Sequence, residues 1–133
     1  MKILTYLLLI FVAAPASAES GNTLRLFYCV HTEQVCVNPD DAAPTSPAKT
    51  AAIAKKALST QEDFVGFIDA GDTTLQFFVE SPDSILVDIP NPASKGSYQT
   101  HVTRTKALQI IERLSPPLLR YRSTLKLEFV RWQ

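Results

Sequence analysis

Three apolar segments separated by short turns occupy the middle of the chain. Residues 64–68, 73–80 and 85–89 are rich in aromatic and β-branched side chains, which favour β-strands. Asp69-Ala70-Gly71-Asp72 separates the first two segments, and Ser81-Pro82-Asp83 separates the last two. Because links this short can join only antiparallel strands, the pattern predicts a meander of three antiparallel strands.

The first eighteen residues have the features of an export signal. Lys2 precedes an apolar run, Pro15 interrupts that run, and Ala16-Ser17-Ala18 supplies the small residues that signal peptidase requires. The run is shorter than the roughly 20 residues of a membrane-spanning helix. We therefore expect residues 1–18 to be a cleaved signal peptide of bacterial type. The mature chain, 19–133, is then periplasmic or secreted, with no stable membrane insertion.

Cys29 and Cys36 are the only two cysteines. Residues 24–30 and 35–37 have the composition of two strands, which places Cys29 opposite Cys36. In an exported protein this pair favours a cross-strand disulfide, which stabilises by roughly 2.5 kcal/mol on the chain-entropy model. The alternatives are a redox pair or a metal cluster that includes His31 and Glu33. Redox pairs usually have two intervening residues, whereas this pair has six.

Two helices are expected beside these strands. Thr45 or Ser46 can cap a helix over 48–58 with Pro47 at its first position, and Thr103 or Thr105 can cap a second helix. Apolar residues recur at helical spacing at Ile53, Ala54, Ala57 and Leu58, and again at Ala107, Ile110, Ile111 and Leu114.

The remaining segments complete a single α+β domain over 19–133. We expect residues 90–101 to form a loop and residues 124–132 to form a final strand with one wet face. The element order is then ββ-α-βββ-α-β. This order predicts an antiparallel sheet of about five to six strands with two helices packed on one face.

Charge is balanced overall but divided along the chain. Residues 57–94 carry seven acids and no Lys or Arg, whereas residues 95–133 carry eight bases against two acids. The simplest interpretation is internal pairing, with the final strand beside the acidic meander. The alternative is a free acidic edge, formed by Asp69, Asp72, Glu80 and Asp83, that steers a cationic partner. A net charge of zero gives no support for nucleic-acid binding.

Motifs for chemistry are missing from the sequence. The two histidines, His31 and His101, belong to no local zinc motif, and no hydrolase elbow or phosphate-binding glycine loop is present. Asp69-Ala70-Gly71-Asp72 is better explained as a turn than as a calcium site. We therefore expect no catalytic residues, no metal and no cofactor. Arg120, Tyr121 and Arg122 form a basic and aromatic cluster that favours a strand start over a partner contact.

These observations predict a binding protein. The segment 29–36 resembles in outline the protruding bridged loop of some exported lysozyme inhibitors, and no motif specific to that family accompanies it. We expect an inhibitor or immunity protein that occludes the active site of a cell-wall- or envelope-targeting toxin. The predicted contact residues are His31, Glu33, Asp69, Asp72, Glu80 and Asp83. The alternatives are a structural or assembly module of the envelope, and a small hydrolase built on acids and a histidine.

Overall fold

The computed structural model describes residues 23–133, so the predicted signal peptide lies outside the described residues. The described chain forms one eight-stranded antiparallel sheet and three α-helices. The strands are β2 (Arg25–Val30), β3 (Val35–Val37), β4 (Ala43–Pro44), β5 (Phe64–Ile68), β6 (Thr74–Ser81), β7 (Ser84–Asn91), β8 (Gly96–Val102) and β9 (Glu128–Arg131). The helices are α2 (Pro47–Ala57), α3 (Arg104–Glu112) and α4 (Tyr121–Thr124).

The spatial order of the strands is β3-β2-β5-β6-β7-β8-β9, and β4 also pairs with β2. The predicted meander is confirmed as β5, β6 and β7, with Phe67 opposite Leu75 and Phe77 opposite Val87. The α+β class is therefore confirmed, although the sheet has more strands than the sequence predicts.

Both predicted helices form, each capped by a hydroxyl side chain. The Ser46 hydroxyl accepts a hydrogen bond from the backbone N–H of Lys49, and Thr103 does the same for Lys106. The Arg104 side chain donates to the backbone carbonyls of Leu58 and Lys55, at 2.7 and 2.9 Å. This contact ties the start of α3 to the end of α2, where carbonyls lack helical partners.

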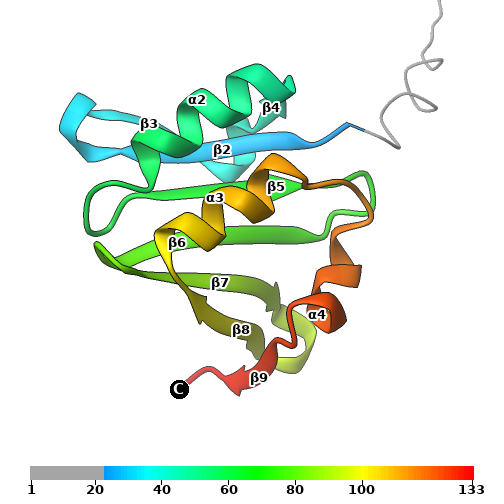
Figure 1. The fold of residues 1–133 in the computed structure, drawn as a ribbon. Helices are drawn as coiled ribbons and strands as arrows, with labels where there is room; N and C mark the ends of the chain where they lie inside the picture. Colours follow the sequence, from blue (N-terminus) through cyan, green and yellow to red (C-terminus); the bar gives the residue numbers. More distant parts are fainter. Residues whose placement is uncertain (1–22) are drawn as a thin grey trace, which may run out of the picture.

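One face of the sheet carries the helices and the core. Figure 1 shows α2 and α3 lying in front of the sheet. Alternate residues of the meander point towards them and are fully buried, as period-two patterning requires. These core residues are Val65, Phe67, Leu75, Phe77, Val79, Ile85, Val87 and Ile89, and they pack with Ala54, Ala57, Leu58 and Ala107 of the helical layer.

The expectation of a loop over 90–101 is wrong. β8 begins at Gly96 and pairs with β7 along its whole length, from Asn91 opposite Gly96 to Ile85 opposite Val102. Its sequence, Gly-Ser-Tyr-Gln-Thr-His-Val, contains too few apolar residues to resemble a strand. The strand forms because β7 offers it a complete row of backbone partners, which is a tertiary effect.

The expected C-terminal strand is also too long. Residues 121–124 form α4, and the strand begins only at Glu128. Because β8 lies between β7 and β9, the basic C-terminal strand does not lie beside the acidic meander. Across the described residues, the one ion pair that joins 57–94 to 95–133 is His101 with Glu80. No Lys or Arg of the basic segment pairs with that acidic segment.

Candidate functional site

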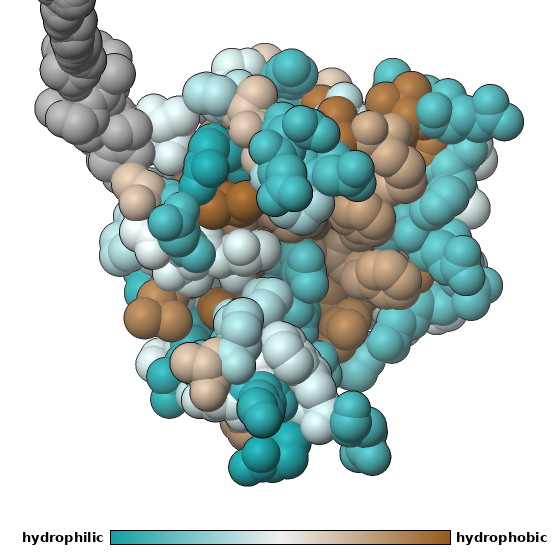
Figure 2. Space-filling model, turned by 180° about the vertical axis from the view of Figure 1, so that it is seen from behind, coloured by the Kyte–Doolittle hydropathy of each residue, from teal (hydrophilic) through white to brown (hydrophobic). Residues whose placement is uncertain are grey.

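The face of the sheet opposite the helices is open to solvent and partly apolar. Figure 2 views the molecule from behind and shows a band of hydrophobic residues running down this face between hydrophilic borders. The register of the strands explains the band, since directly opposed residues share a face. We call it the apolar row, and it consists of Cys36, Cys29, Phe64, Phe78 and Leu86 on five successive strands.

The aromatic members of the apolar row are stacked without a covering element. The rings of Phe64 and Phe78 lie 6.5 Å apart between centroids and nearly parallel, at 10°. Both rings and Leu86 remain partly exposed. Phe27 lies beside Phe64, and its ring fills the space above Gly66, where a Cβ would lie 2.0 Å from the ring. A contiguous apolar surface of this kind is typical of an interaction site.

A polar row runs parallel to the apolar row. Asp88 is 5% exposed, and its two carboxylate oxygens accept hydrogen bonds from the amides of Gln76 and Gln99, each at 2.9 Å. A hollow of about 370 Å³ lies between the two rows and the chain end. Residues that line it include Phe78, Leu86, Gln76, Asp88, Gln99 and Trp132.

The bridged loop projects from one end of this face. The expected register is confirmed: Cys29 lies opposite Cys36 at disulfide distance with their Cα atoms 4.1 Å apart, and Val30 lies opposite Val35. Residues 31–36 are all exposed, and His31–Glu33 form one turn of 3₁₀ helix. Gln34 closes the turn in the left-handed region, with φ of 55°.

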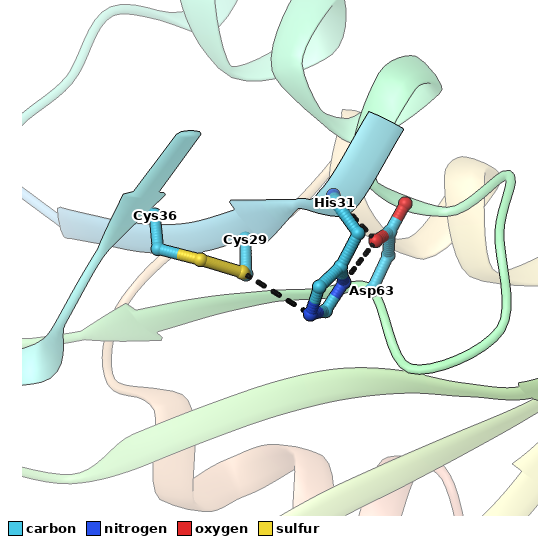
Figure 3. Close-up of polar contacts among 4 residues, drawn as sticks. All are labelled: Cys29, His31, Cys36 and Asp63. Atoms are coloured by element: carbon cyan, nitrogen blue, oxygen red, sulfur yellow. Dashed lines mark hydrogen bonds and ion pairs between the residues drawn. A yellow bond between two sulfur atoms is a disulfide. The ribbon is translucent and has the colours of Figure 1, made fainter. Parts of the chain in front are cut away.

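Asp63 fastens the loop from beneath. This carboxylate is completely buried, and its Oδ1 accepts hydrogen bonds from the backbone N–H of His31 at 2.9 Å and from His31 Nδ1 at 2.6 Å. Oδ2 is buried and has no hydrogen-bond partner. With Nδ1 donating to Asp63, Nε2 of His31 faces the Sγ atom of Cys29 at 3.7 Å (Figure 3).

The second histidine lies at the same end of the sheet. His101 is the register partner of Leu86, and its Nε2 lies 2.7 Å from Glu80 Oε1. We call this region the loop end: it contains His31, Glu33, Asp63, Glu80, Asp83 and His101. The structure therefore brings four of the six predicted contact residues, His31, Glu33, Glu80 and Asp83, to one end of the sheet.

Asp69 and Asp72 lie at the opposite end, which we call the turn end. Asp69 is 4% exposed and accepts hydrogen bonds from the backbone N–H groups of Gly71, Thr73 and Leu118. The Asp72 side chain is 87% exposed and pairs with Arg25 at 3.0 Å. The six predicted contact residues therefore do not form one patch. The carboxylate of Asp69 already accepts hydrogen bonds from the backbone through both of its oxygens.

The basic and aromatic residues 120–122 pack against the molecule beyond the turn end. The Arg122 guanidinium lies 4.0 Å from the centre of the Tyr98 ring, which in turn contacts Phe129. Burial raises the pKa of Tyr121, but hydrogen bonds from Arg120 and Ser115 and the positive charge of Arg120 lower it on balance below its ordinary value of 10.0. The predicted strand start at these residues is wrong, because Tyr121 begins α4.

Sequence reasoning missed Asp63 and the two aromatic members of the apolar row, Phe64 and Phe78. Asp63 sits directly before a predicted strand, and nothing local marks it as buried. Its partner, His31, is 32 residues away. Phe64 and Phe78 cannot be distinguished from core residues by sequence, because the sequence does not show which face of the sheet the helices cover.

Comparisons with known proteins assign no family. The chain matches no protein-family model, no curated protein sequence and no solved structure. Over residues 23–133, no three His, Cys, Asp or Glu side chains are grouped as a metal site would require. None of the helices in that range has the length and hydrophobicity needed to cross a bilayer. The loop end and the apolar row are therefore the features of the molecule that bear on its function.

Proposed function

We propose that this chain is a small exported binding protein, an inhibitor or immunity protein that neutralises a cell-wall- or envelope-targeting antibacterial toxin. The observation that carries the proposal is the bridged loop, whose residues 31–36 are exposed and whose ends are joined by the disulfide, next to the partly exposed side chains Phe64, Phe78 and Leu86 of the apolar row. The loop would enter the active-site cleft of the toxin, and the apolar row would contact the rim of that cleft.

The loop is held in one conformation before any partner arrives. The disulfide joins its two ends, and Asp63 holds the backbone and the side chain of His31. A loop ordered in advance loses little conformational entropy on binding, so more of its contact energy contributes to affinity. Protruding loops of this kind suit concave targets such as enzyme clefts.

The loop end combines apolar contact with negative charge. Val35 is 41% exposed on the edge strand β3, and because it lies opposite Val30 it adds an apolar side chain on the other face of the loop from Cys36 and the apolar row. Glu80 lies near the end of β6, two residues after Phe78, and Asp83 lies in the turn that follows. Both belong to the segment 57–94, which carries no Lys or Arg. Such a surface would attract a partner with a basic rim and would make association sensitive to salt.

Affinity purification from periplasmic extract with the tagged mature protein tests the proposal. The captured partner is then purified and assayed for hydrolysis of peptidoglycan or another envelope polymer. We expect stoichiometric inhibition of that hydrolysis and an association rate that falls as salt increases. Capture of a partner whose activity is not inhibited would contradict the proposal.

Matched substitutions at the two ends of the sheet locate the contact. We expect Val35→Ala to weaken binding by about tenfold or more, and Glu33→Gln to slow association. Leu119→Ala and Asp72→Asn are the controls, since Leu119 is 52% exposed and Asp72 is exposed at the turn end. Equal losses at both ends, or losses only in the controls, would overturn this placement.

Deletion of the gene separates inhibition from an envelope role. An inhibitor should be dispensable when no toxin is present. A structural or assembly module of the envelope should instead leave a damaged envelope in the same strain, and that result would favour the alternative function.

A further inference from the structure

We propose that the Cys29–Cys36 disulfide is a reactive bond that exchanges with thiols, with Cys36 as the attacked sulfur and Cys29 as the leaving thiolate. His31 is the group that stabilises the departing thiolate, and Asp63 positions His31. This inference goes beyond inhibition and does not depend on it, because it concerns the covalent chemistry of the loop.

The two sulfur atoms differ in their access to solvent. Cys36 is exposed on the edge strand β3, whereas Cys29 is 2% exposed on β2 beneath the loop. An incoming thiolate must reach the sulfur that it attacks, so it reacts at Cys36. The electron pair of the broken S–S bond then leaves on Cys29.

His31 lies where this new charge develops. Its Nε2 is 3.7 Å from the Cys29 sulfur, as Figure 3 shows, and its Nδ1 is 2.6 Å from Asp63. With Nδ1–H donated to the carboxylate, protonation of the ring places a hydrogen on Nε2, facing the sulfur. The better a leaving thiolate is stabilised, the faster it departs in thiol–disulfide exchange.

The unpaired carboxylate oxygen of Asp63 also indicates a functional role for the His31–Asp63 pair. It is completely buried, yet its Oδ2 has no hydrogen-bond partner. Leaving a buried polar atom unpaired is unfavourable, by about 1–3 kcal/mol, and exceptions of this kind call for a functional explanation. A buried carboxylate under His31 supplies one, since its hydrogen bond to Nδ1 directs Nε2 of the ring at the Cys29 sulfur. The same turn carries Glu33, which pairs with Lys56 of α2 at 3.5 Å, so these two charges largely offset each other.

The reaction is balanced in atoms and electrons. A thiolate RS⁻ forms an S–S bond to Cys36 while the Cys36–Cys29 bond breaks, which yields the mixed disulfide RS–S–Cys36 and the Cys29 thiolate. No net oxidation occurs in this step. A second RS⁻ can attack the RS sulfur of the mixed disulfide and release Cys36 as a thiolate. The two thiols are then oxidised to RSSR and the protein disulfide is reduced by two electrons.

The spacing of the two cysteines does not exclude a role in thiol–disulfide exchange. Six residues separate Cys29 from Cys36, unlike the usual two of redox motifs. In those motifs the local chain makes the two sulfurs unequal. Here the difference arises from a tertiary contact, between the loop and the residue before β5.

Peptide mapping of a glutathione reaction tests which sulfur is attacked. The oxidised mature protein is mixed with reduced glutathione, quenched with acid, alkylated and analysed by mass spectrometry. We expect the first adduct to carry glutathione on Cys36 and the alkyl group on Cys29. Glutathione predominantly on Cys29, or equally on both cysteines, would overturn the proposal.

The rate of the first step tests His31. We expect His31→Gln to slow adduct formation by about tenfold, the size of one charge-assisted hydrogen bond. His101→Gln is the matched control, because that histidine also pairs with a carboxylate at the loop end. The control should react at the wild-type rate. Equal rates of adduct formation in the wild type and in a folded His31→Gln variant would overturn the proposal.

The pH profile tests Asp63 as a positioning residue. After correction for the thiolate fraction of glutathione, the wild-type rate should rise towards acidic pH as His31 becomes charged. Asp63→Asn should lower the rate across the profile, because the His31 ring loses the carboxylate that orients it, and His31→Gln should remove the rise. A profile that is flat in the wild type would overturn the role of the pair even if a variant unfolds.

Discussion

Strand β5 has a buried aspartate at each end, and the two carboxylates are satisfied very differently. Asp69, after the strand, accepts three backbone N–H groups through both of its oxygens. Asp63, before the strand, accepts two hydrogen bonds from one residue through one oxygen and leaves the other bare. The first carboxylate is used for architecture, and the second retains capacity for chemistry.

The donors explain this difference. At the turn end, Gly71 and Thr73 close the hairpin around Asp69, and Leu118 brings the C-terminal segment onto it. At the loop end, both hydrogen bonds to the Asp63 carboxylate come from His31 on an exposed loop. A fixed backbone surrounds Asp69, whereas Asp63 contacts a group that can gain or lose a proton.

The largest effect is expected from Asp69→Ala. Its removal leaves three backbone N–H groups without their acceptor, including the buried one of Leu118, so we expect a loss of about 3 kcal/mol of unfolding free energy. Urea unfolding of the oxidised protein measures this. Asp72→Asn is the control from the same turn, because asparagine tolerates the φ of 63° at this position, and it should stay within about 0.5 kcal/mol of wild type. Similar losses for both would show that Asp69 does not organise the turn end.

Loss of the disulfide should have the next largest effect. Replacement of both cysteines by alanine removes a short loop closure, and we expect a destabilisation of about 2 kcal/mol. The register of β2 and β3 should survive, because Asp63 still holds His31. Unchanged stability would show that the bridge does not restrict the unfolded chain.

Asp63→Asn should destabilise less, by about 1 kcal/mol. The asparagine oxygen can still accept from His31, and its amide nitrogen replaces an atom that has no partner in the wild type. The decisive measurement is the same urea titration on Asp63→Asn and Asp69→Asn. If the first variant loses as much stability as the second, the contrast between the two aspartates fails.

The smallest effect is expected from the lowered pKa of Tyr121, near the turn end. Because folding favours the phenolate, the group adds stability that is fully present above the unfolded pKa of 10.0 and is lost as pH falls through the folded pKa. The stability of wild type relative to Tyr121→Phe should therefore rise as pH approaches 10.0. Phenolate absorbance and unfolding between neutral and alkaline pH measure it. A difference independent of pH would contradict the lowered pKa.

The features that could be predicted from the sequence are those that depend on interactions between residues close together in the chain. The caps at Ser46 and Thr103, the meander and the opposition of Cys29 and Cys36 depend on neighbours or on a short turn. β8 could not be predicted, because Tyr98 and Val102 are its only large apolar residues and its pairing depends on β7. Likewise, no local signal distinguishes Asp63 from the other acids of its segment, since burial beneath His31 exists only after folding.

The ring of Phe27 over Gly66 makes two distant positions behave as one. A methyl group at 66 would occupy the place of that ring, and the backbone on either side is fixed in the sheet. Neither site can therefore drift alone during evolution. In any homologue with a residue larger than glycine at position 66, we expect a smaller, non-aromatic residue at position 27. An alignment of such homologues would show the substitutions at positions 27 and 66 as correlated.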